Sequence, residues 1–338
     1  MKHIKMLLIT ALCLSLGLSL TGCRRVHHPP LSRSTFLFNT YITITLYEGG
    51  NNAILNQCIR ICKDYEEIFS KTLEGSEIYN MNHRSGGQME FELSDDTASL
   101  IATGLKYCEI SGGAFDITIE PLSSLWDFTS GSAQVPDGAD IAAAAARVDY
   151  RNLRLDGNHL TFLSPDTTID LGSIAKGYIA DRLKDYLVEK HVESAIINLG
   201  GNVLCIGEKA ENTPFLVGLR KPFAGQSDTI CTLNISDLSV VTSGVYERHF
   251  IIDGKNYHHL LNPHTGFPYD NGIAAVTILS ERSVDGDGLS TACFSLGLEK
   301  GMELVNSLKD TYAFFIMEDG TIHYSDGAKN FIEDAPGM

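Results

Sequence analysis

The second half of the chain is dominated by short strand-like runs, and this pattern restricts the fold more than any other feature of the sequence. From Leu160 onward, runs of β-branched and apolar residues follow one another, and two longer helical segments interrupt them. The predicted strands are 168–171, 194–199, 215–219, 230–235, 238–242, 249–252 and 274–279, and the predicted helices are 174–190 and 287–307. Strand runs with a few intervening helices favour an α+β or mixed α/β fold over a regular doubly wound sheet.

The first half supplies further scaffold. Residues 40–47 alternate as a half-buried strand, and residues 52–69 place apolar side chains on one helical face. A second helix is expected at 95–110, and residues 131–147 are expected to form a surface excursion with a short helix. With no internal repeat and no autonomous linker, the pattern predicts one large domain over residues 36–330 and a tail at 331–338.

The N-terminus has the features of a bacterial lipoprotein signal. Lys2 and Lys5 precede an uncharged apolar run at 6–20, which is short for a membrane span. The run ends in the sequence LTGC, which resembles a lipobox with Cys23 as the lipid-carrying residue. We therefore predict a signal peptide at 1–22, a tether at 23–35 and a lipid anchor in the cell membrane, on its extracytoplasmic face. An ordinary secretory signal that contains a cysteine is the alternative.

The chain is acidic, which bears on its ligands. Lys plus Arg total 26 and Asp plus Glu total 42, so the net charge is −16. Cleavage before Cys23 would remove two Lys and leave 24 − 42 = −18. Nucleic acid is therefore not an expected partner. An anionic ligand would need local neutralisation by a metal ion, a helix N-terminus or a lysine.

The cysteines show no metal or redox pattern. Of eight, Cys13 lies in the signal and Cys23 is the expected lipid site. The other six are irregularly spaced and form no CxxC pair: Cys58, Cys62, Cys108, Cys205, Cys231 and Cys293. Buried free thiols are the expected state, with a disulfide among them left open.

A first candidate site is the segment IDLGSIAKGY at 169–178. It is predicted to run from a strand through a glycine turn into a helix, so backbone N–H groups would face an anion such as a pyrophosphate. Lys176 would add a full positive charge. The segment is not a Walker A loop, because Tyr178 stands where lysine is required. A tight strand-to-helix turn with a solvated lysine is the alternative interpretation.

A second candidate is the segment DGDGLST at 285–291. Asp287 and Thr291 are four residues apart, so on a helix they share one face and offer hard oxygen ligands. Few carboxylates and no EF-hand spacing favour Mg²⁺ over Ca²⁺. The alternative is a helix-capping aspartate with a threonine bonded to its own backbone.

A third candidate combines the TSG sequence at 242–244 with YHHLLNPHTG at 257–266. A histidine at a strand end beside an Asn-Pro turn is placed for acid/base chemistry, although a lone histidine in such a place is more often a structural residue. No Ser-His-Asp spacing of the nucleophile-elbow type supports a hydrolase.

Taken together and in order, these motifs resemble the ApbE family of FAD:protein FMN transferases, bacterial enzymes that are often lipoproteins. The resemblance covers roughly residues 36–330 and implies a single α+β domain, T-fold-like, with mixed sheets and flanking helices. The matching segments are 76–78 (SEI), 113–118 (GAFDIT) through 121–126, 170–177 (DLGSIAKG), 198–202 (NLGGN), 242–244, 259–266 (HLLNPHTG) and 287–291.

The resemblance also implies roles for individual residues. His259 corresponds to the family histidine thought to act as a base, and Lys176 is expected to assist catalysis as well as to bind FAD. The other residues implied to bind FAD are Ala114, Phe115, Asp116, Asp170 and Leu260. The residues implied to bind Mg²⁺ are Ser173, through its backbone carbonyl, Asp287 and Thr291.

Two positions depart from the family pattern. The early Met-Gly-Thr flavin contact is replaced by Phe38, Asn39 and Thr40, and a flavin-contacting tyrosine is replaced by Thr72. Both contacts flank the ring system, so stacking on the isoalloxazine is expected to differ from that in better-known members.

The activity implied by the resemblance is Mg²⁺-dependent transfer of FMN from FAD to a Ser or Thr hydroxyl of a partner protein, with release of AMP. Two alternatives stay open: a metal-dependent FAD pyrophosphatase that uses water as acceptor, and a non-catalytic flavin-binding lipoprotein. Asp287 and His259 argue against the pure binder, which would need neither a metal nor a base.

Overall fold

A computed structural model describes residues 29–85, 87–128, 133–225 and 228–333. Residues 1–30 form a unit separate from residues 31–338. The predicted signal peptide, Cys23 and most of the predicted tail lie outside the described residues. One part of the tether prediction is wrong, because residues 31–35 belong to strand β1 (Leu31–Leu37). Strand β1 pairs along its whole length with β2 (Thr40–Glu48), so these residues are part of the sheet.

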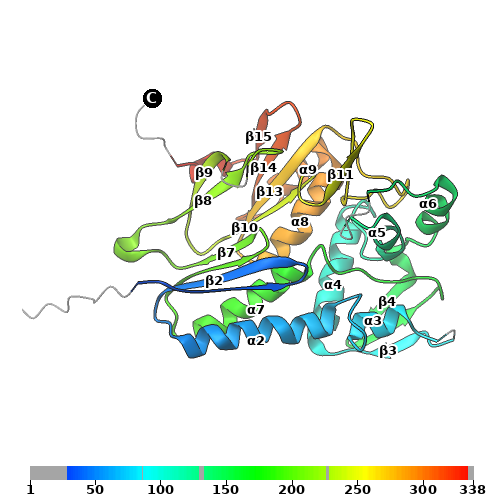
Figure 1. Ribbon diagram of the computed structural model, residues 1–338, viewed down its shortest axis with the longest axis horizontal. Coiled ribbons are helices and arrows are strands. Elements are labelled where there is room, and N and C mark those ends of the chain that lie inside the picture. Colours follow the sequence, from blue (N-terminus) through cyan, green and yellow to red (C-terminus); the bar gives the residue numbers. More distant parts are fainter. Residues whose placement is uncertain (1–28, 86, 129–132, 226–227, 334–338) are drawn as a thin grey trace, which may run out of the picture. The chain divides into compact units, whose positions relative to one another are not determined.

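An eight-stranded antiparallel sheet forms the centre of the domain, in the order β1-β2-β6-β7-β10-β13-β14-β15 (Figure 1). Beyond β1 and β2, its strands are β6 (Ser194–Leu199), β7 (Asn202–Ile206), β10 (Ser239–Gly244), β13 (Ile273–Ser280), β14 (Tyr312–Met317) and β15 (Ile322–Tyr324). The smaller sheets are formed by β3 (Glu90–Glu92), β5 (His159–Phe162) and β4 (Leu153–Asp156), by β8 (Phe215–Arg220) and β9 (Thr229–Ile235), and by β11 (His249–Ile252) and β12 (Lys255–His258).

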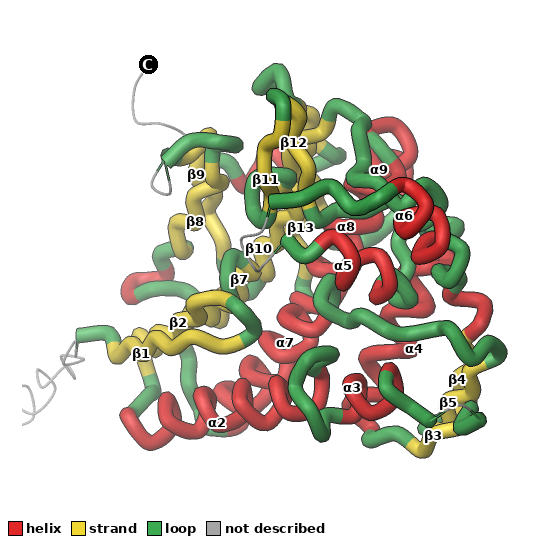
Figure 2. Tube along the Cα trace, turned by 45° about the vertical axis from the view of Figure 1, so that its right-hand side comes forward, coloured by secondary structure: helices red, strands yellow, loops and turns green. Residues whose placement is uncertain are grey.

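Helices cover one face of the central sheet (Figure 2). The helices that contact its strands are α2 (Asn52–Phe69), α7 (Ala175–Glu189), α8 (Ser283–Leu296) and α9 (Leu298–Asn306). Of the others, α4 (Asp95–Ile110) packs on α8, α3 (Glu77–Asn82) packs on α2, and α5 (Glu120–Trp126) and α6 (Gly138–Ala145) pack on each other. Helix α8 packs on β10 and β13 and also on α7, which in turn contacts α2. This layered arrangement of helices and antiparallel sheets is the α+β fold that the sequence predicts.

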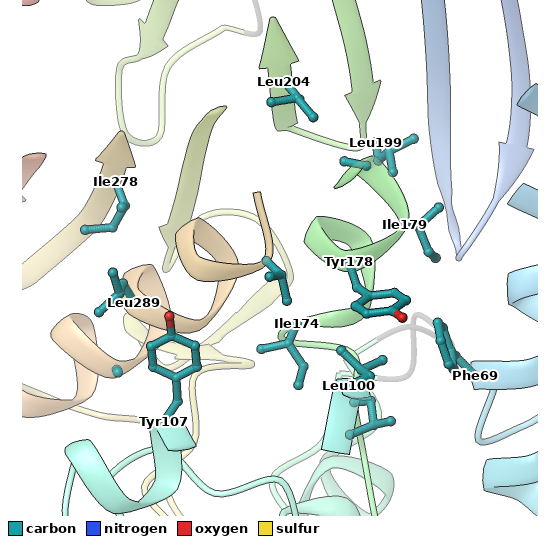
Figure 3. Close-up of a cluster of buried hydrophobic side chains, with 14 of the residues drawn as sticks. Phe69, Leu100, Tyr107, Ile174, Tyr178, Ile179, Leu199, Leu204, Ile278 and Leu289 are labelled. Atoms are coloured by element: carbon teal, nitrogen blue, oxygen red, sulfur yellow. The ribbon is translucent and has the colours of Figure 1, made fainter. Parts of the chain in front are cut away.

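The central strands are buried on both faces. Alternate residues of one strand lie in different apolar clusters: Ile278 of β13 lies in the main cluster with the helices, whereas Leu279 lies in a second cluster with the β8–β9 hairpin. All eight residues of β13 are buried as a result. The main cluster joins α2, α4, α7, α8 and the sheet, and the Phe69 and Tyr178 rings pack edge to face within it, 5.7 Å apart (Figure 3). The position of α7 and α8 is therefore fixed by the sheet on one side and by α2 and α4 on the other.

Two predicted elements are wrong. Residues 168–171 form no strand, because the Ile169 backbone bonds at both its N–H and its carbonyl to the Asn82 side chain instead of to a neighbouring strand. The single helix expected at 287–307 is two helices, α8 and α9. They meet at Gly297, whose φ of +83° is compatible with glycine and ends the first helix.

The cysteines in the described part of the chain form no disulfide bond. The free thiols are those of Cys58, Cys62, Cys108, Cys205, Cys231 and Cys293, and all but Cys231 are buried.

Over the part of the chain that the structure describes, no helix has the length and apolar character needed to cross a bilayer.

Candidate active site

The candidate site lies where α7 and α8 begin against one another. Gly177 makes this contact possible, since a Cβ at this position would lie 2.3 Å from the Ser283 carbonyl oxygen. Asp181, one turn further along α7, accepts hydrogen bonds from the backbone N–H groups of Ser283 and Val284, at 2.7 and 3.0 Å. A carboxylate on α7 thereby caps the N-terminus of α8, whose own N-cap residue makes no side-chain cap bond.

Asp287 is held at this junction by two donors. Its side chain is almost fully buried, with 4% of its surface exposed. Oδ2 accepts from the Gly177 backbone N–H at 2.5 Å, and Oδ1 accepts from Asn202 Nδ2 at 3.1 Å. Burial raises the pKa of the carboxyl group, while the charge of Lys176 and the two hydrogen bonds oppose that rise. A cationic partner would offset the cost of burying the ionised carboxylate.

Thr291 follows Asp287 by one turn of α8, as the sequence predicts. Its hydroxyl lies 3.1 Å from Ser243 Oγ, and Ser243 Oγ lies 2.9 Å from Ser290 Oγ. Ser290 in turn donates to the Asp287 backbone carbonyl at 3.0 Å. The TSG sequence of β10 therefore meets the DGDGLST sequence of α8 directly.

Ser173 lies two residues before α7, and Lys176 is the second residue of the helix. In a regular helix the Gly177 N–H would donate to the Ser173 carbonyl, four residues earlier. Here it donates to Asp287, and the helix begins only at Ala175. Lys176 Nζ lies 3.5 Å from the Gly172 carbonyl oxygen, and its charge acts on both Asp287 and His259.

His259 follows β12 directly and is half-buried. Its Nδ1 donates to the Arg248 carbonyl at 3.3 Å, so Nε2 is the ring nitrogen with the free lone pair. Burial lowers the pKa of the imidazole to about 3, and the charges of Arg248, His258 and Lys176 act in the same direction. His259 is therefore neutral at physiological pH and able to accept a proton at Nε2.

The predicted flavin turn at 114–116 is tied into the protein. Asp116 is buried and accepts three bonds, from the backbone N–H and hydroxyl of Thr118 and from the Tyr150 N–H. The Phe115 side chain is also buried, and the Ala114 carbonyl accepts from the Tyr269 hydroxyl at 2.9 Å. In this arrangement the side chains of Phe115 and Asp116 serve the turn itself.

Asp170 lies in an ion pair that the sequence analysis did not foresee. Lys71 Nζ lies 2.9 Å from Asp170 Oδ2, and Ser123 donates to the same oxygen at 2.7 Å. The Gly172 N–H donates to Oδ1 at 2.9 Å. Burial alone would raise the pKa of Asp170, but Lys71 and these bonds outweigh it and hold the pKa at about 2.

The remaining predicted positions are less central. The Leu260 side chain is buried in the main apolar cluster, and its carbonyl accepts from the Tyr269 N–H at 3.0 Å. Thr72, at the tyrosine position of the family pattern, is exposed. Phe38 and Asn39 form the tight turn between β1 and β2, each with φ of +55°.

The oxygen atoms at and around Asp287 are of the chemical kind that hard cations accept as ligands. Among the described residues, no group of three His, Cys, Asp or Glu side chains is arranged to hold a metal ion. A carboxylate, a hydroxyl and a backbone carbonyl from Asp287, Thr291 and Ser173 nevertheless fit Mg²⁺, which keeps several waters and accepts substrate phosphate oxygens. The buried carboxylate of Asp287 is the observation on which this fit depends.

The structure adds Asn202, Ser243 and Lys71 to the residues that sequence reasoning selected. Asn202 and Ser243 stand in segments that match the family pattern, but nothing in the sequence places them beside Asp287 and Thr291. Lys71 immediately precedes the departure at Thr72, which was the available signal that this loop differs.

Comparison with known proteins identifies the family. The ApbE family pattern matches residues 38–316. The chain belongs to the ApbE family. It is 38% identical over 293 residues to an FAD:protein FMN transferase of Klebsiella pneumoniae, covering 86% of this chain and 90% of the relative. It is 31% identical over 336 residues to an FAD:protein FMN transferase of Treponema pallidum, covering 93% of this chain and 92% of the relative.

The fold agrees with a solved ApbE structure. The crystal structure of the ApbE protein from Thermotoga maritima superposes with a TM-score of 0.82 at 30% sequence identity, covering 90% of this chain and 100% of that chain. The family resemblance and the α+β domain predicted from the sequence are thus confirmed.

Proposed function

We propose that this protein transfers the FMN moiety of FAD to a Ser or Thr hydroxyl of a partner protein in a Mg²⁺-dependent reaction that releases AMP. The observation that carries the proposal is the buried Asp287 carboxylate, held against the first turn of α7 beside Lys176. Membership of the ApbE family and the names of the relatives support the same activity.

The charges of the site suit a pyrophosphate. The N-terminal end of α7 has a positive dipole, and Lys176 adds a full charge one residue into the helix. Phosphoryl transfer depends mainly on positioning and on stabilising negative charge. Asp287, Thr291 and the Ser173 carbonyl would hold Mg²⁺, which when bound supplies charge neutralisation at the pyrophosphate.

His259 is assigned the role of general base. The acceptor hydroxyl is a weak nucleophile until its proton is removed, and His259 Nε2 has the lone pair to accept that proton. The acceptor oxygen forms a bond to the FMN phosphorus, and the bond from that phosphorus to the oxygen shared with AMP breaks. AMP leaves with the electron pair, and the proton stays on His259 until it is lost to solvent.

Incubation with FAD, Mg²⁺ and a candidate acceptor protein tests the proposal. Covalent flavin fluorescence on the acceptor in a denaturing gel, with one AMP released for each flavin attached, is the expected result. Release of FMN and AMP without labelling would identify an FAD pyrophosphatase. Binding of FAD without AMP release would identify a non-catalytic flavin-binding protein.

We further propose that Cys23 carries lipid and holds the enzyme on the extracytoplasmic face of the cell membrane. The LTGC sequence after an apolar run of signal-peptide length supports this location. Acceptors would then be extracytoplasmic proteins.

A further inference from the structure

We propose that Ser243 and Asn202 are positioning residues, which set the direction of the hydrogen bonds around Asp287 and Thr291 so that both present lone pairs to a cation. This inference rests on the proposed function, because it concerns the same metal site. It assigns a role to the TSG and NLGGN sequences, which the reaction itself does not use.

A first chain of hydrogen bonds runs from Thr291 through Ser243 and Ser290 to the backbone carbonyl of Asp287, and this carbonyl sets the direction of every bond in it. The Asp287 backbone carbonyl has no proton, so Ser290 must donate to it, at 3.0 Å. Since its single proton is used there, Ser290 accepts from Ser243 at 2.9 Å. Ser243 has then used its own proton, so the 3.1 Å contact with Thr291 requires Thr291 to donate. The Thr291 proton therefore points to Ser243, and its oxygen keeps lone pairs for another partner.

A second chain of hydrogen bonds, from Ser239 through Ser283 and Asn202, ends on the Asp287 carboxylate and orients it in the same way. Asn202 is buried, with 2% of its surface exposed. Its amide group donates through Nδ2 to Asp287 Oδ1 at 3.1 Å, so the amide oxygen faces Ser283, which donates to it at 2.8 Å. Ser283 in turn accepts from Ser239 at 2.8 Å. Donors thereby reach one lone pair of Asp287 Oδ1 and, from Gly177, one of Oδ2, and the remaining lone pairs stay available.

This arrangement matters because a hydroxyl whose hydrogen points at a cation repels that cation, whereas one whose oxygen lone pair points at it can act as a ligand. A threonine in a helix commonly bonds to the carbonyl four residues earlier, which for Thr291 is that of Asp287. Ser290 occupies that carbonyl and Ser243 receives the Thr291 proton. Partners of this kind, which orient metal ligands without touching the metal, commonly change metal affinity by roughly 10- to 100-fold when they are removed.

The test is a titration of the purified protein with Mn²⁺, followed by electron paramagnetic resonance, with Mg²⁺ as competitor and with FAD absent or present. Ser243→Ala should weaken Mn²⁺ binding by roughly 10- to 100-fold. Ser243→Thr retains the hydroxyl and should bind as the wild type does. The matched control is Thr242→Val on the same strand, because Thr242 bonds to Thr277 of β13 and not to α8.

A second variant separates hydrogen-bond direction from packing. Ser290→Ala removes the acceptor of the Ser243 proton, so that proton would turn toward Thr291 and occupy one of its lone pairs. Weaker Mn²⁺ binding is expected although Ser243 and Thr291 are both intact, and thermal unfolding of each variant verifies that it folds.

The outcomes distinguish the two proposals. Wild-type Mn²⁺ affinity in both Ser243→Ala and Ser290→Ala would overturn the positioning role and leave the metal site intact. Absence of Mn²⁺ binding by the wild-type protein, with and without FAD, would overturn the metal site of the proposed function and the positioning role with it.

Discussion

Lys71 Nζ lies 2.9 Å from Asp170 Oδ2, which joins the loop after α2 to the loop that leads into α7. The ammonium group also donates to the hydroxyls of Ser123 and Ser124, at 2.6 and 3.1 Å. This pair fixes the turn that carries Ser173 and leads into the first turn of α7, where Lys176 lies, so its loss should affect both stability and FAD binding.

Replacing Lys71 with Met should lower the free energy of unfolding by about 1–3 kcal/mol, because Asp170 would lose its charged partner. The affinity for FAD should weaken as well. Urea denaturation and FAD titration measure the two effects. Lys309→Met is the matched control, since Lys309 pairs with Asp310 on the exposed surface; an equal loss of stability in both variants would contradict a special role for Lys71.

The same pair predicts a response to acid. The folded-state pKa of Asp170 is about 2, below the value of about 4 for an unfolded aspartate. Its contribution to stability is therefore present above about pH 4 and is lost as the pH falls from there through 2. Chemical denaturation at several pH values should show a smaller acid dependence in Lys71→Met than in the wild type.

Gly177→Ala should disrupt the junction of α7 and α8. The added Cβ would lie 2.3 Å from the Ser283 carbonyl, so the helices must separate, and overpacking of this kind costs about 1–3 kcal/mol. Transfer activity should fall with stability, because the Gly177 N–H also holds Asp287. Gly138→Ala in α6, where a Cβ meets nothing within 4 Å, is the control for thermal unfolding and activity.

Local sequence patterns predicted the elements better than their contacts. The helix at 52–69 was predictable because its apolar face is periodic and Asn51 caps it through bonds to Ala53 and Ile54. The strand expected at 168–171 is absent because a side chain distant in sequence, that of Asn82, takes up the backbone groups of Ile169. Periodicity contains no information about such a partner.

The same distinction applies to the candidate site. Asp287 and Thr291 were predictable as neighbours because they lie one helical turn apart. Asn202 lies 85 residues from Asp287 along the chain, and only the strand order of the sheet brings them together. Lys71 was missed for the same reason, because its partner Asp170 belongs to a separate loop.

Asp287→Ala should fold yet lose transfer activity by at least roughly 10²-fold, as is typical when electrostatic stabilisation of a reacting phosphate is removed. The wild-type enzyme should be inactivated by EDTA and restored by Mg²⁺, whereas the variant should not respond to Mg²⁺. Asp285→Asn on the same helix is the control, since Asp285 bonds to the Tyr107 hydroxyl instead. Full activity of Asp287→Ala in EDTA would exclude the metal assignment.

Cys23→Ser should move the protein from the membrane fraction toward the soluble fraction, because serine cannot carry the thioether-linked lipid. Cell fractionation followed by mass spectrometry of the mature N-terminus measures both location and modification. An uncleaved protein that stays in the membrane fraction would instead indicate anchoring by the apolar run at 6–20.

His259→Asn distinguishes a base from a binding residue. If His259 only contacts FAD, the variant should bind FAD more weakly, and saturating FAD should restore the rate of transfer. If His259 is the general base, the variant should bind FAD with nearly unchanged affinity, and its rate of transfer should fall by roughly 10²- to 10⁴-fold. His264→Asn is the matched control, because His264 is exposed on the following loop.

The pH dependence of the wild-type enzyme completes this test of His259. The pKa of the free imidazole is about 3, lowered by burial and by neighbouring positive charge, so the base stays deprotonated well below the ordinary histidine value of about 6.5. We therefore expect kcat/KM to show no decline due to His259 between pH 7 and pH 5. In the FAD complex the negative pyrophosphate raises this pKa, so kcat should decline at a higher pH than kcat/KM does. A decline in kcat/KM centred near pH 6.5 that disappears in His259→Asn would contradict the low pKa of the free enzyme, and full activity of this variant at saturating FAD would remove His259 from the mechanism.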